Sequence, residues 1–129
     1  MEEYGAKIIE TLAEFDIESE LADIVLGPTV IQFRIQIEPG IKVSRIAALS
    51  NDLALALAVP SLRVEAPILG QPYVGIEIPN PKRRPVLLRD VIASSDFMQS
   101  KYELPLPLGL KVDGTPMVVG LENLPHLLV

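Results

Sequence analysis

The sequence predicts an α+β fold: a two-layer sandwich in which an antiparallel or mixed sheet carries two main helices on one face. Residues 2–16 have apolar side chains at helical spacing, whereas residues 29–38 alternate between apolar and polar side chains. The predicted order of elements is helix, strand, strand, helix, strand, strand, followed by shorter elements. This order is typical of an α+β domain.

The first helix is expected over residues 2–16, where Glu2 and Glu3 in the first turn suit the helix dipole. Its apolar face is formed by Tyr4, Ile8, Leu12 and Phe15. A short strand is expected over residues 20–26, and the Gly27-Pro28 pair that follows it predicts a turn.

Residues 29–38 form the clearest predicted strand. One face carries Thr29, Ile31, Phe33, Ile35 and Ile37, and the other carries Gln32, Arg34, Gln36 and Glu38. A period of two with one polar face indicates an antiparallel sheet that is covered on one side only. We therefore expect the polar face of this strand to be in contact with water.

A second helix is expected over residues 44–58, with Ser44 as its N-cap and with Val59, which precedes Pro60, marking its end. Its apolar stripe consists of Ile46, Leu49, Leu53 and Leu57. Residues 62–66 and 73–78 then alternate as strands. The six residues between them have a proline at each end, so the two strands are expected to pair as a hairpin.

The pattern loosens after residue 79. Residues 86–94 indicate a short helix, residues 95–100 a further helical turn, and the Asp113-Gly114 pair the turn of another hairpin. The last three residues are apolar and are predicted to be the start of a buried strand: Leu127, Leu128 and Val129.

Length and composition limit the classes of protein. The chain has 129 residues, of which 49% are hydrophobic and 22% charged, which fits one globular domain, expected over residues 1–129. It has no cysteine, so disulfides and thiolate chemistry are excluded. The longest apolar run, residues 53–59, is far shorter than the ~18 residues that cross a membrane. No signal peptide is recognisable, and no membrane contact is expected.

Charge is distributed unevenly. The net charge of −6 arises in the first part of the chain, since residues 1–38 carry −7 and residues 39–129 carry +1. An acidic domain binds duplex DNA poorly by itself because phosphates must be neutralised, although a basic face on the second part remains possible.

No catalytic set is recognisable in the sequence. His126 is the only histidine and is interpreted as a spacer residue, and no glycine-rich phosphate-binding motif occurs. Glu65 and Glu77 could form a carboxylate pair on neighbouring strands, but solvated strand faces are the favoured interpretation. No cofactor, metal or small-molecule substrate is therefore expected for this chain.

The candidates for a surface that faces DNA or a neighbouring subunit are basic. Lys82, Arg83 and Arg84 form the only basic cluster, and Lys42 and Arg45 are further candidates. A merely solvated loop is an equally good interpretation of the cluster.

Several ordered stretches resemble one family. They are LAEFDIESELADIVLGP, PGIKVSRI, DLALAL, RVEAPILGQPYVGIEIPN, VLLRDVI and GTPMVVGLENLPHLLV. Together they are similar to the α-domain of the FtsK/SpoIIIE DNA translocases and cover nearly the whole chain. The sequence departs from the family at residues 37–39 and at Gln71, where a lysine is common. The change at Gln71 puts a charge contact shared with the family at this turn in doubt.

The resemblance implies a non-catalytic domain that precedes a RecA-like motor, with ATP and Mg²⁺ bound by the motor and not here. The chain is expected to end just before the motor's phosphate-binding loop. Its implied partners are its own motor domain, neighbouring subunits of a hexameric ring and, weakly, double-stranded DNA. The implied location is the cytoplasmic side of a bacterial inner membrane or septum, to which the parent protein is anchored.

Two other classes compete with this interpretation. A stand-alone adaptor could dock to proteins through its apolar surfaces without any role on DNA. A small-molecule enzyme is disfavoured because no catalytic set is recognisable.

Overall fold

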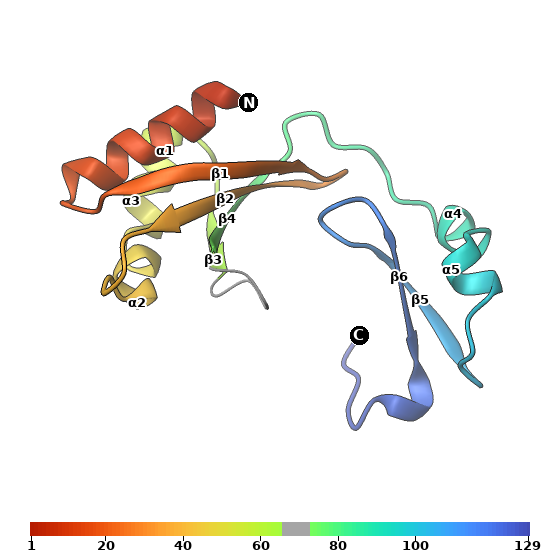
Figure 1. Ribbon diagram of the computed structural model, residues 1–129. Helices are drawn as coiled ribbons and strands as arrows, with labels where there is room; N and C mark the ends of the chain where they lie inside the picture. The colour runs from red at the N-terminus through yellow and green to blue at the C-terminus, as the bar shows by residue number, and fades with distance from the viewer. Residues whose placement is uncertain (66–72) are drawn as a thin grey trace.

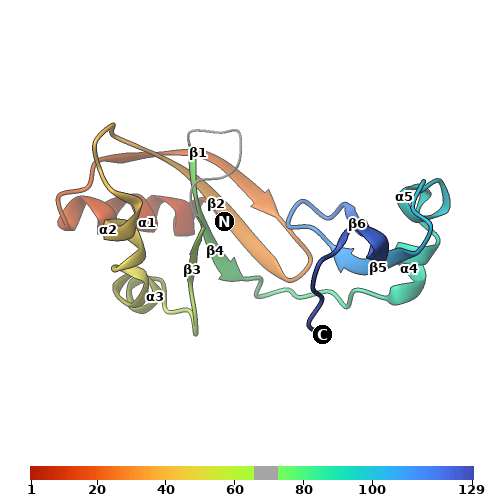
Figure 2. The same ribbon diagram turned by 90° about the horizontal axis from the view of Figure 1, so that it is seen from below.

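The computed structural model describes residues 1–65 and 73–129 of the chain. The elements form two groups joined by an extended segment, as Figures 1 and 2 show from two directions. Residues 1–79 are called the sandwich lobe and residues 86–129 the hairpin lobe. The α+β class predicted from the sequence is confirmed, because helices cover an antiparallel sheet.

Helix α1 (Glu2–Glu14) lies over the edge of the sheet and buries Ile8 and Leu12 completely. It approaches strand β1 (Ser19–Leu26) so closely that a Cβ atom on Gly5 would lie 2.6 Å from a methyl group of Leu21. The helix ends two residues before the predicted boundary. Phe15, predicted on the buried face, is 40% exposed because it follows the last helical turn.

The main sheet has four strands in the described part of the chain, in the order β1-β2-β4-β3, and every neighbouring pair is antiparallel. Its strands are β1 (Ser19–Leu26), β2 (Val30–Ile37), β3 (Arg63–Glu65) and β4 (Tyr73–Pro79). The predicted pairing of residues 62–66 with 73–78 is confirmed by the register of β3 and β4. The predicted turn at 67–72 lies outside the described residues.

The helix predicted over residues 44–58 is two helices, α2 (Val43–Ala47) and α3 (Ser50–Leu57). The hydrogen-bonding ladder changes at Leu49, whose N–H donates to the Ile46 carbonyl three residues back at 3.0 Å. The predicted N-cap Ser44 is also wrong. Lys42 occupies the cap position with extended backbone angles, and its side chain makes no cap hydrogen bond.

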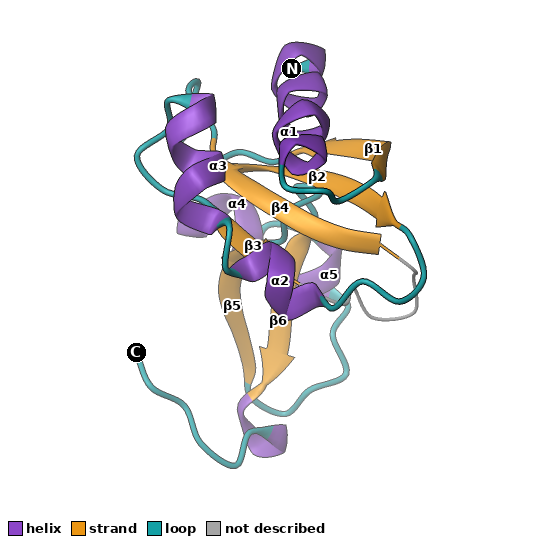
Figure 3. Ribbon diagram, turned by 90° about the vertical axis from the view of Figure 1, so that its left-hand side faces the viewer, coloured by secondary structure: helices purple, strands orange, loops and turns teal. Residues whose placement is uncertain are grey.

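The hydrophobic core lies between the sheet and its two main helices, α1 and α3, which cover the same face (Figure 3). Every strand residue predicted to face inward in the middle of β2 and β4 is buried, as is most of the stripe predicted for α2 and α3. The buried set is Ile8, Leu12, Ile17, Ile31, Phe33, Ile35, Ile46, Leu53, Leu57, Val74, Ile76 and Ile78. The sandwich lobe therefore encloses a continuous core of its own.

The opposite face of the sheet is not simply solvated, which corrects the prediction for the polar side of β2. Gln32 and Glu77 are buried there, at 5% and 8% exposure. Period-two alternation identifies the two faces of a strand but not what surrounds each of them. On the same face of β2, Arg34 is half-buried and Gln36 is exposed, so the burial is confined to part of this face.

The hairpin lobe contains the predicted short helices and hairpin. Its elements are α4 (Leu88–Ile92), α5 (Ser95–Met98), β5 (Pro105–Leu110), β6 (Pro116–Gly120) and a 3₁₀ turn at Leu121–Asn123. The turn between β5 and β6 places Gly114 at φ +85°, as the Asp113-Gly114 prediction required. Leu127, Leu128 and Val129 are exposed and irregular, so the predicted buried strand is wrong. Within the described residues no strand pairs with them.

Candidate functional site

The basic cluster Lys82–Arg84 lies on the segment that joins the two lobes. Its three side chains are exposed. The backbone of this segment is nevertheless fixed, because the Arg84 N–H donates to the Pro28 carbonyl at 3.0 Å. The Asn80 N–H and side chain donate to the carbonyls of Thr29 and Gly27 at 2.8 and 2.7 Å. The cluster is thus anchored beside the turn between β1 and β2.

Lys42 and Arg45 lie at the other end of β2. Lys42 precedes α2, five residues after the end of β2, and the Arg45 guanidinium donates to the Phe15 carbonyl at 2.9 Å. The structure therefore does not bring the five predicted basic residues together. Lys82–Arg84 remain one group, and Lys42 and Arg45 form another.

A row of polar side chains crosses the face of the sheet opposite α1 and α3. The Arg34 guanidinium lies 3.8 Å from the Asp23 carboxylate and donates to the Gln32 side chain at 3.3 Å. Gln32 in turn donates to Glu77 at 3.3 Å. These bonds join strands β1, β2 and β4. We assign this row a structural role, because each polar side chain in it is hydrogen-bonded to or ion-paired with a neighbour in the row.

Glu77 also meets Glu65 of β3, so the carboxylate pair considered from the sequence is present. Burial raises the pKa of Glu77, and the hydrogen bond with Glu65 and the repulsion from its charge raise it further. Arg63 and Gln32 act in the opposite direction on the same pKa. The favoured interpretation of Glu77 as a solvated residue is therefore wrong.

A second group of carboxylates surrounds an open hollow of about 460 Å³ at the end of the sheet where β1 begins and β2 ends. We call it the carboxylate hollow. Glu18, Glu20 and Glu38 line it, and its apolar lining consists of Ile9, Ala13, Ile37 and Pro39. A hydrogen bond with Glu18, together with repulsion from its charge, raises the pKa of Glu38. The hollow thus holds more negative charge than its own residues compensate.

Sequence reasoning missed this hollow, although a signal for it was present. Ser19 pairs with Ile37 in the register of β1 and β2, so Glu18 and Glu38 follow as the next opposed positions. The predicted strands and the Gly27-Pro28 turn indicate this pairing only to within one residue, because a bulge between Leu21 and Asp23 shifts the register of β1 against β2. Ser19 also lines the hollow, and its hydroxyl oxygen is shielded from solvent with no hydrogen-bond partner in the described part of the chain.

The described residues contain no group of three or more potential ligands that could hold a metal ion. His126 lies in the exposed segment after the last 3₁₀ turn. No helix in residues 1–65 or 73–129 has the length and apolar character needed to cross a bilayer.

Comparison with known proteins places this geometry in a family. The model of the FtsK alpha domain matches residues 1–80, which are the sandwich lobe and Asn80, the residue that follows it. The chain belongs to the FtsK alpha domain family. The family suggested by the sequence stretches is thereby confirmed.

Similar full-length proteins carry matching names. The chain is 46% identical over 127 residues to the DNA translocase FtsK of Caldanaerobacter subterraneus subsp. tengcongensis, covering 98% of this chain and 18% of that protein. It is 41% identical over 127 residues to the DNA translocase FtsK of Haemophilus influenzae, covering 98% of this chain and 24% of that protein. It is 41% identical over 119 residues to the DNA translocase SftA of Bacillus subtilis, covering 92% of this chain and 12% of that protein. The FtsK alpha domain chain thus spans less than a quarter of the length of each of these relatives.

Proposed function

We propose that this chain is a non-catalytic, ring-forming part of an ATP-driven translocase that moves double-stranded DNA in chromosome segregation and cell division. Membership of the FtsK alpha domain family is the observation that carries the proposal. In this proposal, a motor domain of the same protein binds ATP and Mg²⁺ and supplies the chemistry. The chain's own role is to contact neighbouring subunits and to transmit the movement of the motor.

The sandwich lobe suits a part that transmits force. Among its described residues, twelve buried aliphatic and aromatic side chains form one cluster, and close-packed interiors of this kind deform little. Such a block moves as a unit when its neighbour changes shape. The anchoring of residues 80 and 84 to the turn between β1 and β2 extends this block into the joining segment.

The distribution of net charge along the chain is consistent with weak binding to DNA. The sandwich lobe, residues 1–79, carries a net charge of −7 and residues 80–129 carry +1. A ring lining that held phosphates tightly would slow a moving duplex, so weak contact is an advantage. The competing adaptor function has no comparable support, because the relatives at 41–46% identity are named DNA translocases.

The proposal is tested by titrating a fluorescent duplex with the chain at physiological salt. We expect a dissociation constant no tighter than about 10⁻⁴ M, the weak limit of non-specific binding. Micromolar binding, or hydrolysis of ATP by this chain alone, would contradict it.

A second test replaces the aligned segment of the Bacillus subtilis translocase SftA with this chain. We expect the chimera to retain duplex-dependent ATP hydrolysis and movement along DNA. The same protein with the segment deleted serves as the control, and we expect it to lose movement. Movement that survives the deletion would contradict the proposed role.

A further inference from the structure

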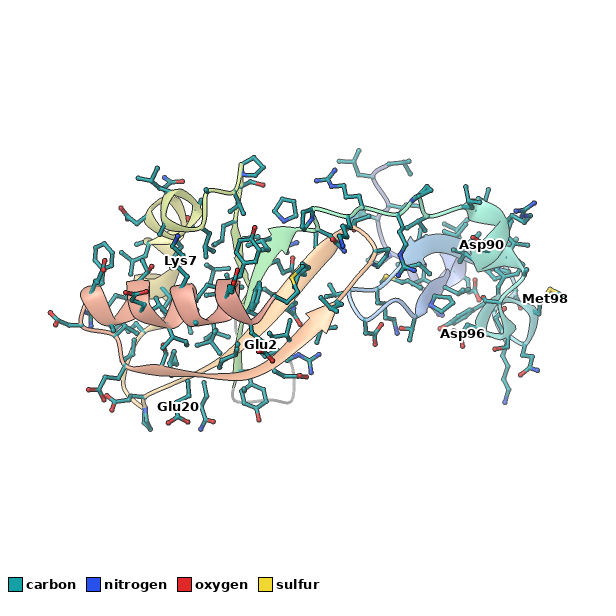
Figure 4. The ribbon with its side chains drawn as sticks, turned by 90° about the horizontal axis from the view of Figure 1, so that it is seen from above. Glu2, Lys7, Glu20, Asp90, Asp96 and Met98 are labelled. Atoms are coloured by element: carbon teal, nitrogen blue, oxygen red, sulfur yellow. The ribbon has the colours of Figure 1, made fainter. Side chains whose placement is uncertain are left out.

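The carboxylate hollow and the basic segment, defined here as residues 81–85, lie at opposite ends of the same sheet. The hollow lies where Ser19 pairs with Ile37, and the basic segment is bonded to the turn beyond the pairing of Leu26 with Ile31. Figure 4 places Glu20 at the end of the molecule away from the hairpin lobe, which carries Asp90 and Asp96. One chain therefore cannot bring its own basic segment to its own hollow.

The two surfaces are complementary in charge and in chemistry. The hollow presents the carboxylates of Glu18, Glu20 and Glu38, whereas the basic segment presents three cations. Within the described residues no carboxylate lies within ion-pair distance of these cations, since the one ion pair found joins Arg34 to Asp23. Lysine and arginine stems can cover apolar surface while their charged groups reach carboxylates. The apolar lining beside the carboxylates suits those stems.

The basic segment is also prepared for binding. Pro81 and Pro85 flank the three cations, and each proline fixes its own φ and favours an extended conformation for the residue before it; Pro81 and Lys82 lie in a turn. The bond from Arg84 to Pro28 fixes the segment further. A segment that is ordered before binding loses less conformational entropy on binding.

We propose that the basic segment of one copy docks into the carboxylate hollow of a second copy, so that copies associate head to tail. This inference rests on the proposed function, and it assigns Lys82–Arg84 to a neighbouring subunit and not to DNA. A head-to-tail contact uses two different surfaces of each copy and can close into a ring when repeated. The occupant of the hollow is thus a second copy of this chain.

One further feature of the hollow supports a cationic occupant. The raised pKa of Glu38 reflects carboxylates in contact without a compensating charge, and a docked cation would supply that charge. The Ser19 hydroxyl has no hydrogen-bond partner within the described residues, and because it is shielded from solvent a docked arginine or lysine would reach it only if a neighbouring side chain moved. Arg34 and Lys42 are the cations closest in sequence to Glu38, but neither lines the hollow.

The absence of cysteine makes a direct test possible. Glu38→Cys and Arg83→Cys are made as separate variants, mixed at low salt, and allowed to form disulfides. We expect mixed dimers, cross-linked between positions 38 and 83, to form severalfold faster than dimers of either variant with itself. Asp96→Cys mixed with Arg83→Cys is the matched control, because Asp96 is another exposed acid, on the hairpin lobe. We expect added salt to remove the preference.

Charge reversal provides the second arm. Adding Glu18→Lys and Glu20→Lys to the Glu38→Cys variant is expected to abolish the preferred cross-link. Adding Lys82→Glu and Arg84→Glu to its partner is expected to restore it. Unchanged circular dichroism melts verify that each variant folds, as expected for exposed positions.

Three outcomes would overturn the inference. The first is cross-linking between positions 83 and 96 as fast as between positions 83 and 38, and the second is a preference for same-site dimers. The third is a Lys82→Glu/Arg83→Glu/Arg84→Glu variant with weakened duplex binding and unchanged association between copies, which would assign the segment to DNA. The chimera and duplex titrations do not depend on these cross-links, so failure of the inference is distinguishable from failure of the proposed function.

Discussion

The two lobes of the chain differ in how completely they bury their apolar side chains. Among its described residues, the sandwich lobe encloses twelve hydrophobic side chains in one cluster. In the hairpin lobe, all of which the structure describes, Val91 is the one large hydrophobic side chain that is buried. Its exposed large side chains include Leu88, Ile92, Met98, Leu104, Leu108 and Leu128. The difference indicates that the first lobe is stable by itself, whereas the second leaves much of its apolar surface uncovered.

The same boundary is found in the family comparison, since the FtsK alpha domain model ends at residue 80. Contact between the lobes is narrow but close. A Cβ atom on Gly27 would collide with the backbone carbonyl of Val112 in the turn between β5 and β6. Substitutions in the core of the sandwich lobe, at the contact between the lobes and at single features of the sandwich lobe should therefore differ in their effects on stability.

Removing the largest core side chain should have the greatest effect. Phe33 is wholly buried at the centre of the sheet, so Phe33→Ala should lower the free energy of unfolding by about 3–5 kcal/mol. Urea unfolding followed by circular dichroism measures the change. Val91→Ala in the hairpin lobe is the comparison, and it should hardly move the main transition. Equal losses from the two variants would contradict the difference between the lobes.

A change at the contact between the lobes should have an intermediate effect. In Gly27→Ala the new Cβ would lie 2.7 Å from the Val30 carbonyl oxygen and would also press on Val112. Both neighbours are backbone and cannot rotate away, so we expect a loss of about 1–3 kcal/mol of stability. Val112→Ala removes only a side chain at the same contact and serves as the control. A Gly27→Ala variant with wild-type stability would contradict the close approach.

The end of α3 offers a stabilising substitution. Ala58 has φ +54°, and the N–H groups of Ala58 and Val59 donate to the carbonyls of Leu55 and Ala54 at 3.1 and 3.0 Å. This is a Schellman cap, in which glycine avoids the strain of the left-handed conformation. Ala58→Gly should raise the stability by about 1 kcal/mol, measured by urea unfolding. Ala54→Gly, inside the helix, should instead lower it by about the same amount.

Glu77 should make stability depend on pH in a definite direction. Its pKa in the folded chain lies above the ordinary glutamate value of 4.5, chiefly because of burial, so the folded state holds the proton more tightly than the unfolded state. The contribution of Glu77 is therefore greatest at a pH below 4.5 and declines as the pH rises through its folded pKa. Glu77→Gln, which resembles the protonated acid, should gain stability relative to wild type over that range. A difference between the two proteins that is independent of pH would contradict the raised pKa.

Much of the fold could be predicted because its patterns are strong. The alternation over β2 and the helical spacing of Ile8 and Leu12 each identify an element and the face that it buries. The division into α2 and α3 could not be predicted, because it depends on one hydrogen bond of Leu49 and not on apolar spacing. Sequence patterns also cannot show that Gln32 is buried on the polar face of β2 while Gln36 on the same face is exposed.

The candidate site was predicted less well than the fold. The basic cluster could be found because its residues are adjacent in sequence. The carboxylate hollow is formed by positions 18 and 38, which become neighbours only through the register of β1 and β2. Whether Lys82–Arg84, Lys42 and Arg45 face DNA or a subunit stays a prediction.

Amide hydrogen exchange on the whole chain tests most directly whether the sandwich lobe is a self-contained block. Amides in the middle of β2 and β4 should exchange only through global unfolding, with protection that matches the free energy from urea denaturation. Amides of α4, α5, β5 and β6 should exchange earlier, through a separate opening of lower free energy. Uniform protection of both lobes, or faster exchange in β2 than in β5, would contradict the account.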